Sequence, residues 1–174
     1  MRNHHQLAPE AREDLISRAW YSHDARWFNA VAEEFGMEAA NRLNRKAVRA
    51  TGAVEAKRLQ ATLGLGQIGS VPAFLEFMDA GRDLYVAAPL IEMTIRPLDE
   101  RSYTVEVGRC FVADNIARAG IAETYQCAVF DRIQGWHDGL GFPLIEDVPA
   151  AGCAIAAGKP CIRTFGTAAA LTAE

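Results

Sequence analysis

Hydrophobic residues recur every three or four positions through the first 63 residues, which is the spacing of one face of an α-helix. The first such stretch covers residues 8–35, with Pro9 at a position that suits a first helical turn and Gly36 at its end. A second stretch covers residues 37–63. The pattern therefore predicts a long helical hairpin at the start of the chain.

The inner stripe predicted for the first helix is strongly aromatic. It carries Trp20 and Trp27 with His23 between them, and Asp24 follows the histidine. Two interpretations stay open for the His23–Asp24 pair: a hydrogen-bonded histidine in the core, or part of a polar site in a pocket with aromatic walls.

Small residues mark the inner side of the second helix. Ala47, Ala50, Gly52 and Ala53 would let another helix approach closely. The basic residues of the same helix are expected to form its solvated face, and they are Arg42, Arg45, Lys46, Arg49, Lys57 and Arg58.

The segment Gly64-Leu-Gly-Gln-Ile-Gly69 matches the G-x-G-x-x-G pattern of dinucleotide-binding proteins. That fingerprint requires a strand before it, and here a helix precedes it. We therefore interpret the segment as a helix end and a turn that lead into a third helix over residues 70–80.

From Leu90 the pattern changes to alternation of apolar and polar residues, which predicts an antiparallel hairpin with one apolar face over residues 90–107. A short helix is expected over residues 111–119, a longer one over residues 122–140, and a final strand over residues 161–165 that could join the hairpin. The predicted class is α+β, in which the helical hairpin packs with a small antiparallel sheet and further helices.

Length and composition favour one domain, residues 1–174, with a helical half (about 8–80) and a mixed half (about 88–166). The chain has a net charge of -4 and lacks the stripe of basic residues that nucleic-acid binding requires, so nucleic acid is not expected as a partner. No apolar run reaches the roughly 20 residues of a membrane span, and the first residues lack the apolar region of a secretory signal, so a cytoplasmic protein is expected. His4 and His5 are expected to belong to a frayed terminus.

All four cysteines lie within residues 110–161, at Cys110, Cys127, Cys153 and Cys161. Zinc modules usually bring cysteines in close C-x-x-C pairs, and none is present here. A site with all four sulfurs, for zinc or an iron-sulfur cluster, would have to come from four separate segments. For each cysteine a simple role as a small core residue also remains open.

Nucleophilic catalysis needs one thiolate, a base or positive charge beside it, and hydrogen-bond donors where negative charge develops. A helix over residues 122–140 would place Cys127 and Asp131 one turn apart, with His137 on the adjoining apolar stripe. His137 or His23 could supply the base. Cys110 and Cys161 are the competing nucleophiles.

The cysteine-containing half resembles the L-2-amino-thiazoline-4-carboxylic acid hydrolase-like proteins. The resemblance is carried by a strand that ends in Cys110, by Cys127-Ala-Val-Phe-Asp131 and by Gly158-Lys-Pro-Cys161 before an alternating strand. The N-terminal pieces 18–28 and 33–36 are similar to an uncharacterised prokaryotic family related to these hydrolases. Cys153 and His137 match no part of the hydrolase pattern.

The resemblance implies hydrolysis of a C–N or C=N bond in a small cyclic or amidine-like substrate, with cysteine as the reactive group and no cofactor. In this hypothesis Trp20, His23, Asp24 and Trp27 line the substrate pocket. The alternative is a non-catalytic protein whose cysteines bind zinc or an iron-sulfur cluster, as a redox or ligand sensor. A third possibility is a structural domain that forms a homodimer through Trp20 and Trp27.

The hydrolase hypothesis predicts that one cysteine reacts with iodoacetamide much faster than the other three near neutral pH, because a catalytic thiol has a lowered pKa. Mass spectrometry of the alkylated protein at successive times measures this. Uniformly slow labelling of all four thiols would contradict the hypothesis.

Overall fold

The computed structural model describes residues 7–86, 90–147 and 152–167. The chain divides into two compact units, residues 1–40 and residues 41–174. The second unit contains the second long helix, from Asn41 onward, together with the sheet. His4 and His5, for which a frayed terminus is expected, lie outside the described residues.

The first unit contains the helix α1 (Pro9–Phe35), which begins with proline in its first turn and ends at Gly36 with a φ of 85°. The predicted helix is confirmed, but its predicted buried stripe is wrong. Trp20 is 56% exposed and Trp27 is 40% exposed, whereas Phe28 is buried. The physical reason is that a helix without a second element in its own unit has little against which to bury an apolar face.

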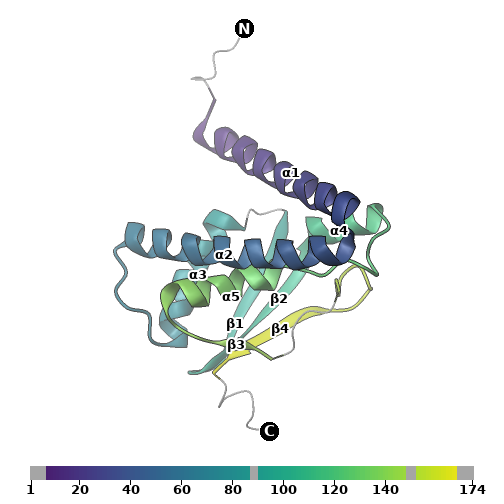
Figure 1. The fold of residues 1–174 in the computed structure, drawn as a ribbon. Coiled ribbons are helices and arrows are strands. Elements are labelled where there is room, and N and C mark those ends of the chain that lie inside the picture. Colours follow the sequence, from purple (N-terminus) through teal and green to yellow (C-terminus); the bar gives the residue numbers. More distant parts are fainter. Residues whose placement is uncertain (1–6, 87–89, 148–151, 168–174) are drawn as a thin grey trace. The chain divides into compact units, whose positions relative to one another are not determined.

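The second unit carries the remaining elements of the fold (Figure 1). They are α2 (Met37–Leu63), α3 (Val71–Tyr85), β1 (Ile91–Asp99), β2 (Ser102–Cys110), α4 (Phe111–Arg118), α5 (Val129–Leu140), β3 (Ile145–Glu146) and β4 (Cys161–Gly166). The strands form one antiparallel sheet in the order β1-β2-β4-β3. The protein is therefore an α+β protein, as predicted.

The predicted β-hairpin, the predicted turn after the second helix and the predicted final strand are confirmed. The hairpin extends beyond the predicted residue 107, because β2 runs on to Cys110, and β1 continues through Pro97 and Leu98 to Asp99. At the G-x-G-x-x-G segment, α2 ends at Leu63, and Ser70 then caps α3 by accepting the Ala73 backbone N–H. The segment is thus a helix end and a connection, as its context indicated.

The predicted helix over residues 122–140 is wrong in its first part, because α5 begins only at Val129. The side chain of buried Asn41 explains the difference. Its Nδ2 donates to the Thr124 carbonyl at 2.7 Å, and its Oδ1 accepts the Gln126 N–H at 2.9 Å. These long-range bonds satisfy backbone groups that a helix would have used, so the segment before α5 stays irregular.

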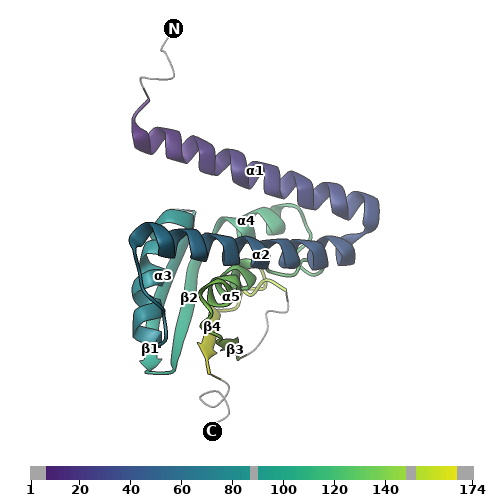
Figure 2. The ribbon, with the colours of Figure 1, turned by 60° about the vertical axis from the view of Figure 1, so that its left-hand side comes forward.

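The core lies between the sheet and the helices α3 and α5. Its largest members come from these elements, and they are Phe74, Phe77, Tyr103, Phe130, Trp136 and Phe165. Phe74 of α3 packs on Tyr103 of β2, and Phe130 of α5 packs on Phe165 of β4. Both helices therefore cover the same face of the sheet. Figure 2 shows α5 between α2 and the strands.

The helices α2 and α5 touch backbone to backbone. A Cβ atom added to Gly135 would lie 2.1 Å from the Arg49 carbonyl oxygen, and one added to Gly139 would lie 2.4 Å from that of Ala53. On the other helix, a Cβ at Gly52 would lie 2.4 Å from the Arg132 carbonyl oxygen. The prediction that small residues of the second helix admit another helix is confirmed for Gly52 and Ala53. It is wrong for Ala47 and Ala50, which are exposed because they lie on the other side of the helix from α5.

Ion pairs flank this crossing. Arg45 and Arg49 of α2 pair with acidic residues of α5, Asp131 at 2.8 Å and Asp138 at 2.6 Å. In the opposite direction, Arg132 Nε of α5 donates to Glu55 of α2 at 2.8 Å. The prediction that the basic residues of the second helix form its solvated face is therefore wrong for Arg45, which is part-buried because the close crossing brings Asp131 within reach. Arg49 is exposed, as predicted, and pairs with Asp138 at the surface.

No helix in the described part of the chain is both long and apolar enough to cross a membrane.

Replacement of Gly135 by alanine is expected to destabilise the protein by about 3 kcal/mol or more, because the new methyl group would collide with backbone atoms of α2. Urea unfolding measures the change. Gly69→Ala is the matched control, since a Cβ there meets no atom within 4 Å, and its effect should stay within about 0.5 kcal/mol. Equal stability of the two variants would contradict the close contact.

Candidate functional site: a pocket lined by four cysteines

The structure brings all four cysteines to one small pocket. Its lining comes from four separate parts of the chain: the end of β2, the start of α5, the turn segment before β4, and β4 itself. The open volume of the pocket is about 10 Å³, which is room for roughly one water molecule. The side chains around the sulfurs are mostly apolar, and they include Val107, Val129, Phe130 and Ile155.

Cys110 is the last residue of β2 and directly precedes α4. It is buried, and its thiol faces the first backbone N–H groups of α4, those of Val112 and Ala113. Burial raises the pKa of Cys110, and these N–H groups act in the opposite direction. The cysteine predicted at a strand end before a helix is thus confirmed in position, at the positive end of α4.

Cys127 lies two residues before the start of α5, close to the Val129 N–H. The predicted arrangement of Cys127 and Asp131 one turn apart on a single helix is therefore wrong, because Cys127 is not helical. Asp131 lies on α5 and accepts Arg45 Nε at 2.8 Å and Nη2 at 3.3 Å. The Asp131 carboxylate is thus held by an arginine of α2.

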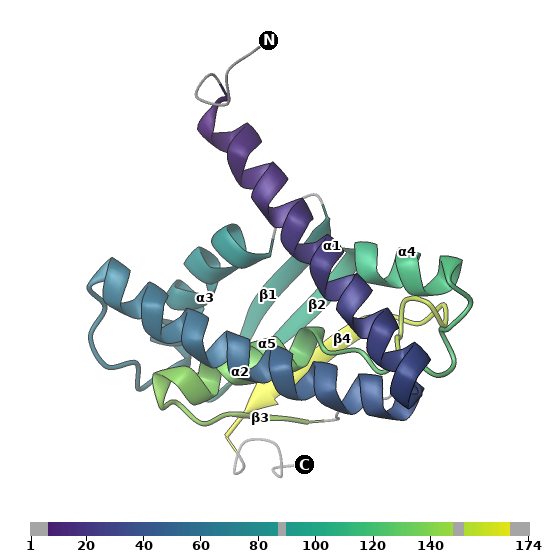
Figure 3. The same cartoon turned by 45° about the horizontal axis from the view of Figure 1, so that its top comes forward.

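Cys161 opens β4, where it pairs with Val107 of β2 and shares the inner face of the sheet with it. Cys153 begins a tight turn segment, in which its carbonyl accepts the Ala157 N–H at 3.0 Å. Figure 3 shows this segment, in yellow, beside α4. Sequence reasoning left Cys153 without a place in the site, and the structure puts it among the other three thiols.

Burial is the main influence on these thiols. It raises the pKa of Cys127 to about 12 and that of Cys161 to about 11, because the thiolate loses its water. Negative charge on the neighbouring thiols raises both values further. The Val129 N–H and the Arg163 guanidinium oppose the shift without overcoming it. These two cysteines are therefore protonated at neutral pH in the absence of a further positive charge.

Arg163 is the pocket residue that sequence reasoning missed. It lies two positions after Cys161 on β4, so both side chains are on the inner face, and it lines the pocket. Its guanidinium lies 5.3 Å from the centre of the Phe130 ring. The alternation of the final strand was the available signal, because it places positions 161 and 163 on one face.

His137 lies away from the thiols, in the aromatic core. Its ring is fully buried, Nε2 lies 2.7 Å from the Tyr103 hydroxyl, and the rings of Phe74 and Phe165 pack edge-on against it. Burial lowers the pKa of His137 to about 4. The histidine is neutral at pH 7 and is engaged with Tyr103 rather than with a cysteine.

The predicted substrate residues belong to α1, in the other unit. Trp20 and His23 stack with ring centres 6.4 Å apart, and Trp27 is exposed. A substrate-binding role for Trp20, His23, Asp24 and Trp27 stays a prediction, as does dimerisation through the two tryptophans.

Among the described residues, no group of three or more His, Cys, Asp or Glu side chains is arranged to hold a metal ion as it stands. The four thiols share a pocket but are wider apart than ligands of one ion. All four are free thiols rather than disulfides.

The fold and the pocket define an α+β protein with a four-cysteine site. The model of a family described as "Family of unknown function (DUF6125)" matches residues 10–134, and the chain belongs to this family. The matched range includes Cys110 and Cys127 and ends before Cys153 and Cys161. No curated protein and no solved structure matches the chain.

The buried His137 predicts a specific loss of stability in acid. Its pKa of about 4 in the fold lies below the ordinary 6.5, so its contribution is complete above pH 6.5 and is lost as the pH falls from 6.5 towards 4. Between pH 7.5 and pH 5 this amounts to about 2 kcal/mol. Urea unfolding at both pH values measures it.

Over this pH interval the double variant Tyr103→Phe/His137→Phe should lose about 2 kcal/mol less stability than the wild type, because it has no buried histidine to protonate. Replacing both residues also avoids leaving the Tyr103 hydroxyl unpaired in the core. Tyr103→Phe alone keeps the histidine and serves as the control with a steep pH dependence. Equal pH dependence of the wild type and the double variant would refute the assignment.

Proposed function

We propose that the protein binds one zinc ion through the thiolates of Cys110, Cys127, Cys153 and Cys161, as a non-catalytic metal-binding domain. The observation that carries the proposal is the meeting of four cysteines from four chain segments at one pocket. The protein has no other cysteine. Four sulfur ligands are a common set for structural zinc.

The open space in the pocket is about that of one water molecule, which a single ion could fill. Because the thiols are wider apart than ligands of one ion, zinc binding requires the sulfurs to turn inward. The turn segment that carries Cys153 can follow them more readily than the strands can, since it lacks a ladder of hydrogen bonds.

The electrostatics of the pocket suit a metal more than a nucleophile. Thiols with a pKa raised to about 12 and about 11 are poor nucleophiles at neutral pH, whereas a bound zinc ion removes their protons. The backbone N–H groups at the starts of α4 and α5 face Cys110 and Cys127 and would stabilise the resulting thiolates.

A site closed by four sulfurs leaves no open position for a substrate, so its role would be structural or sensory. The zinc ion would tie the turn segment and β4 to the ends of β2 and α5. A reducing compartment such as the cytoplasm would keep the four thiols available for it.

Hydrolysis by Cys127 of a C–N or C=N bond is less well supported. Such a reaction needs a base close to the sulfur. Asp131 is held by Arg45, and His137 is bound to Tyr103 in the core. The iodoacetamide experiment separates the two functions, since the zinc proposal expects slow labelling of every cysteine.

Protein purified under reducing conditions should contain or take up one zinc ion per chain, as measured by elemental analysis. Cobalt in place of zinc should give the intense visible bands and the sulfur-to-metal charge transfer of a tetrahedral thiolate site. Each of the four Cys→Ser variants should bind zinc at least about tenfold more weakly, since each removes one ligand. A hydrolase would instead depend mainly on one cysteine.

Folded protein with four reduced thiols that takes up neither zinc nor cobalt would overturn the proposal. Iron together with acid-labile sulfide would also overturn it, in favour of an iron-sulfur cluster.

A further inference from the structure

An exposed and mostly apolar stripe runs along α1. Its members recur every three or four positions, so they share one side of the helix, and they are Ile16, Trp20, His23 and Trp27. Ile16 is 68% exposed, and the other three are exposed as well. Buried Phe28 follows Trp27 by one position and therefore points about 100° away from the stripe. The stripe is thus a separate side of α1 that still lacks a cover.

The area of the stripe is at the upper end of what a monomeric protein leaves in water. Together with Ala19 and Ala30 beside it, the stripe presents on the order of 500 Å² of mostly apolar surface, since a large aromatic side chain carries roughly 150–250 Å². Two copies packed stripe to stripe would bury about 1,000 Å², which is the lower limit of a specific interface. A second copy of α1 would therefore be a sufficient cover.

The net charge of α1 argues against a membrane as the cover. Helices that lie on anionic membranes carry mainly lysine and arginine on their polar side. The range Pro9–Phe35 has three arginines, Arg12, Arg18 and Arg26, against six acidic residues, Glu10, Glu13, Asp14, Asp24, Glu33 and Glu34. An anionic lipid surface would repel such a helix. A protein surface suits it better.

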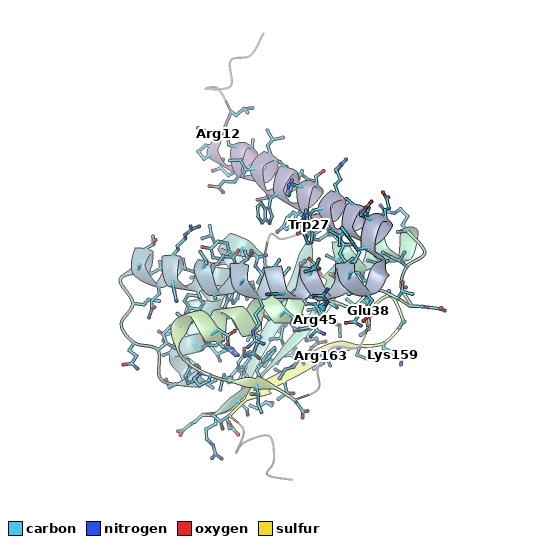
Figure 4. All side chains as sticks on the ribbon, viewed as in Figure 1. Arg12, Trp27, Glu38, Arg45, Lys159 and Arg163 are labelled. Carbon is cyan, nitrogen blue, oxygen red and sulfur yellow. The ribbon has the colours of Figure 1, made fainter. Side chains whose placement is uncertain are left out.

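Opposite charges border the two ends of the stripe. Arg12 lies four residues before Ile16, and Glu33 and Glu34 lie six and seven residues after Trp27. All three charged side chains are exposed, and none of them forms an ion pair within the part of the chain that the structure describes. Figure 4 shows Arg12 near the start of α1 and Trp27 in its second half. These charges are therefore available to a partner.

An antiparallel pair of helices lets the stripe cover itself. If Ile16 of one copy lies opposite Trp27 of the other, then Trp20 lies opposite His23, and the same contacts repeat on the other side of the twofold axis. Each tryptophan then packs on a side chain of the other copy.

The same alignment brings the opposite charges together. Arg12 of one copy lies level with Val31 of the other, which is two or three residues from Glu33 and Glu34, or about 3–4.5 Å along the helix axis. These long side chains can span that offset. A parallel pair would instead place Arg12 beside Arg12 and each glutamate beside its own counterpart, and like charges repel. The charge pattern therefore favours the antiparallel pair.

We infer that two copies of this chain associate through α1 as an antiparallel helix pair, with the stripe at its centre and Arg12 of each copy beside Glu33 and Glu34 of the other. The inference depends on α1 alone and is independent of the proposed zinc site. Because the interface is small, the expected dissociation constant is on the order of 1–100 μM.

Sedimentation equilibrium of the full-length protein at roughly 1–300 μM tests the association, since this range brackets the expected dissociation constant. The wild type should change from monomer to dimer over this range. Trp20→Gln/Trp27→Gln should weaken the dimer at least about 100-fold, because it removes both aromatic anchors. Leu84→Gln/Leu98→Gln is the control: these leucines, on α3 and β1, are 61% and 59% exposed, and their replacement should leave the association unchanged.

Charge reversal tests the direction of the pair. Arg12→Glu should weaken the dimer about 3–10-fold, and so should Glu33→Arg/Glu34→Arg, because each places like charges side by side. The triple variant Arg12→Glu/Glu33→Arg/Glu34→Arg exchanges the charges between the two ends of the stripe, and it should return to within about threefold of the wild type.

A wild type that stays monomeric over the whole concentration range would overturn the inference. So would a dimer that persists in Trp20→Gln/Trp27→Gln, since another surface would then form it. A triple variant that does not recover would refute the antiparallel arrangement. Binding of a monomeric wild type to vesicles of anionic phospholipid would overturn the inference in favour of a membrane surface. If Trp20→Gln/Trp27→Gln loses helix content by circular dichroism, the charge-reversal series decides.

Discussion

The rest of the second unit depends on the contact between the backbones of α2 and α5. Gly52, Gly135 and Gly139 leave no room for a side chain at the crossing, and the two helices therefore approach as closely as backbones can. This distance brings Arg45 and Arg49 within reach of Asp131 and Asp138. Cys127 lies two residues before the start of α5. The cysteine pocket is thus supported by a helix crossing that contains none of its cysteines.

The other face of α5 is packed against the sheet by aromatic rings. Phe130 and His137 contact Phe165, and Tyr103 completes the group through its hydroxyl bond to His137. This packing holds β4 in register with β2, which sets Cys161 opposite Val107. Tyr103 and His137 bind each other inside an apolar core through the hydroxyl and Nε2, so this pair contributes to a unique packing arrangement.

Two opposing effects meet at the thiols. Burial disfavours the thiolate form of Cys110, Cys127 and Cys161, whereas helix N-termini and Arg163 favour it. In the described structure burial prevails at these three thiols and raises the pKa of each. A divalent cation would reverse that balance, because its charge lies closer to the sulfurs than any group of the protein. The same reasoning explains why a pocket with four cysteines need not contain a nucleophile.

The sequence by itself determined the elements whose signals are local. The period of hydrophobic residues predicted the long helices and the hairpin, and the small residues around Gly52 predicted a close helix contact. Only the tertiary structure decided the start of α5, because Asn41 binds the backbone of a segment 83 residues away in the chain. It also decided the meeting of the four cysteines and the removal of His137 from them. These features depend on contacts between distant segments, and residue spacing carries no information on which distant side chains will share a pocket.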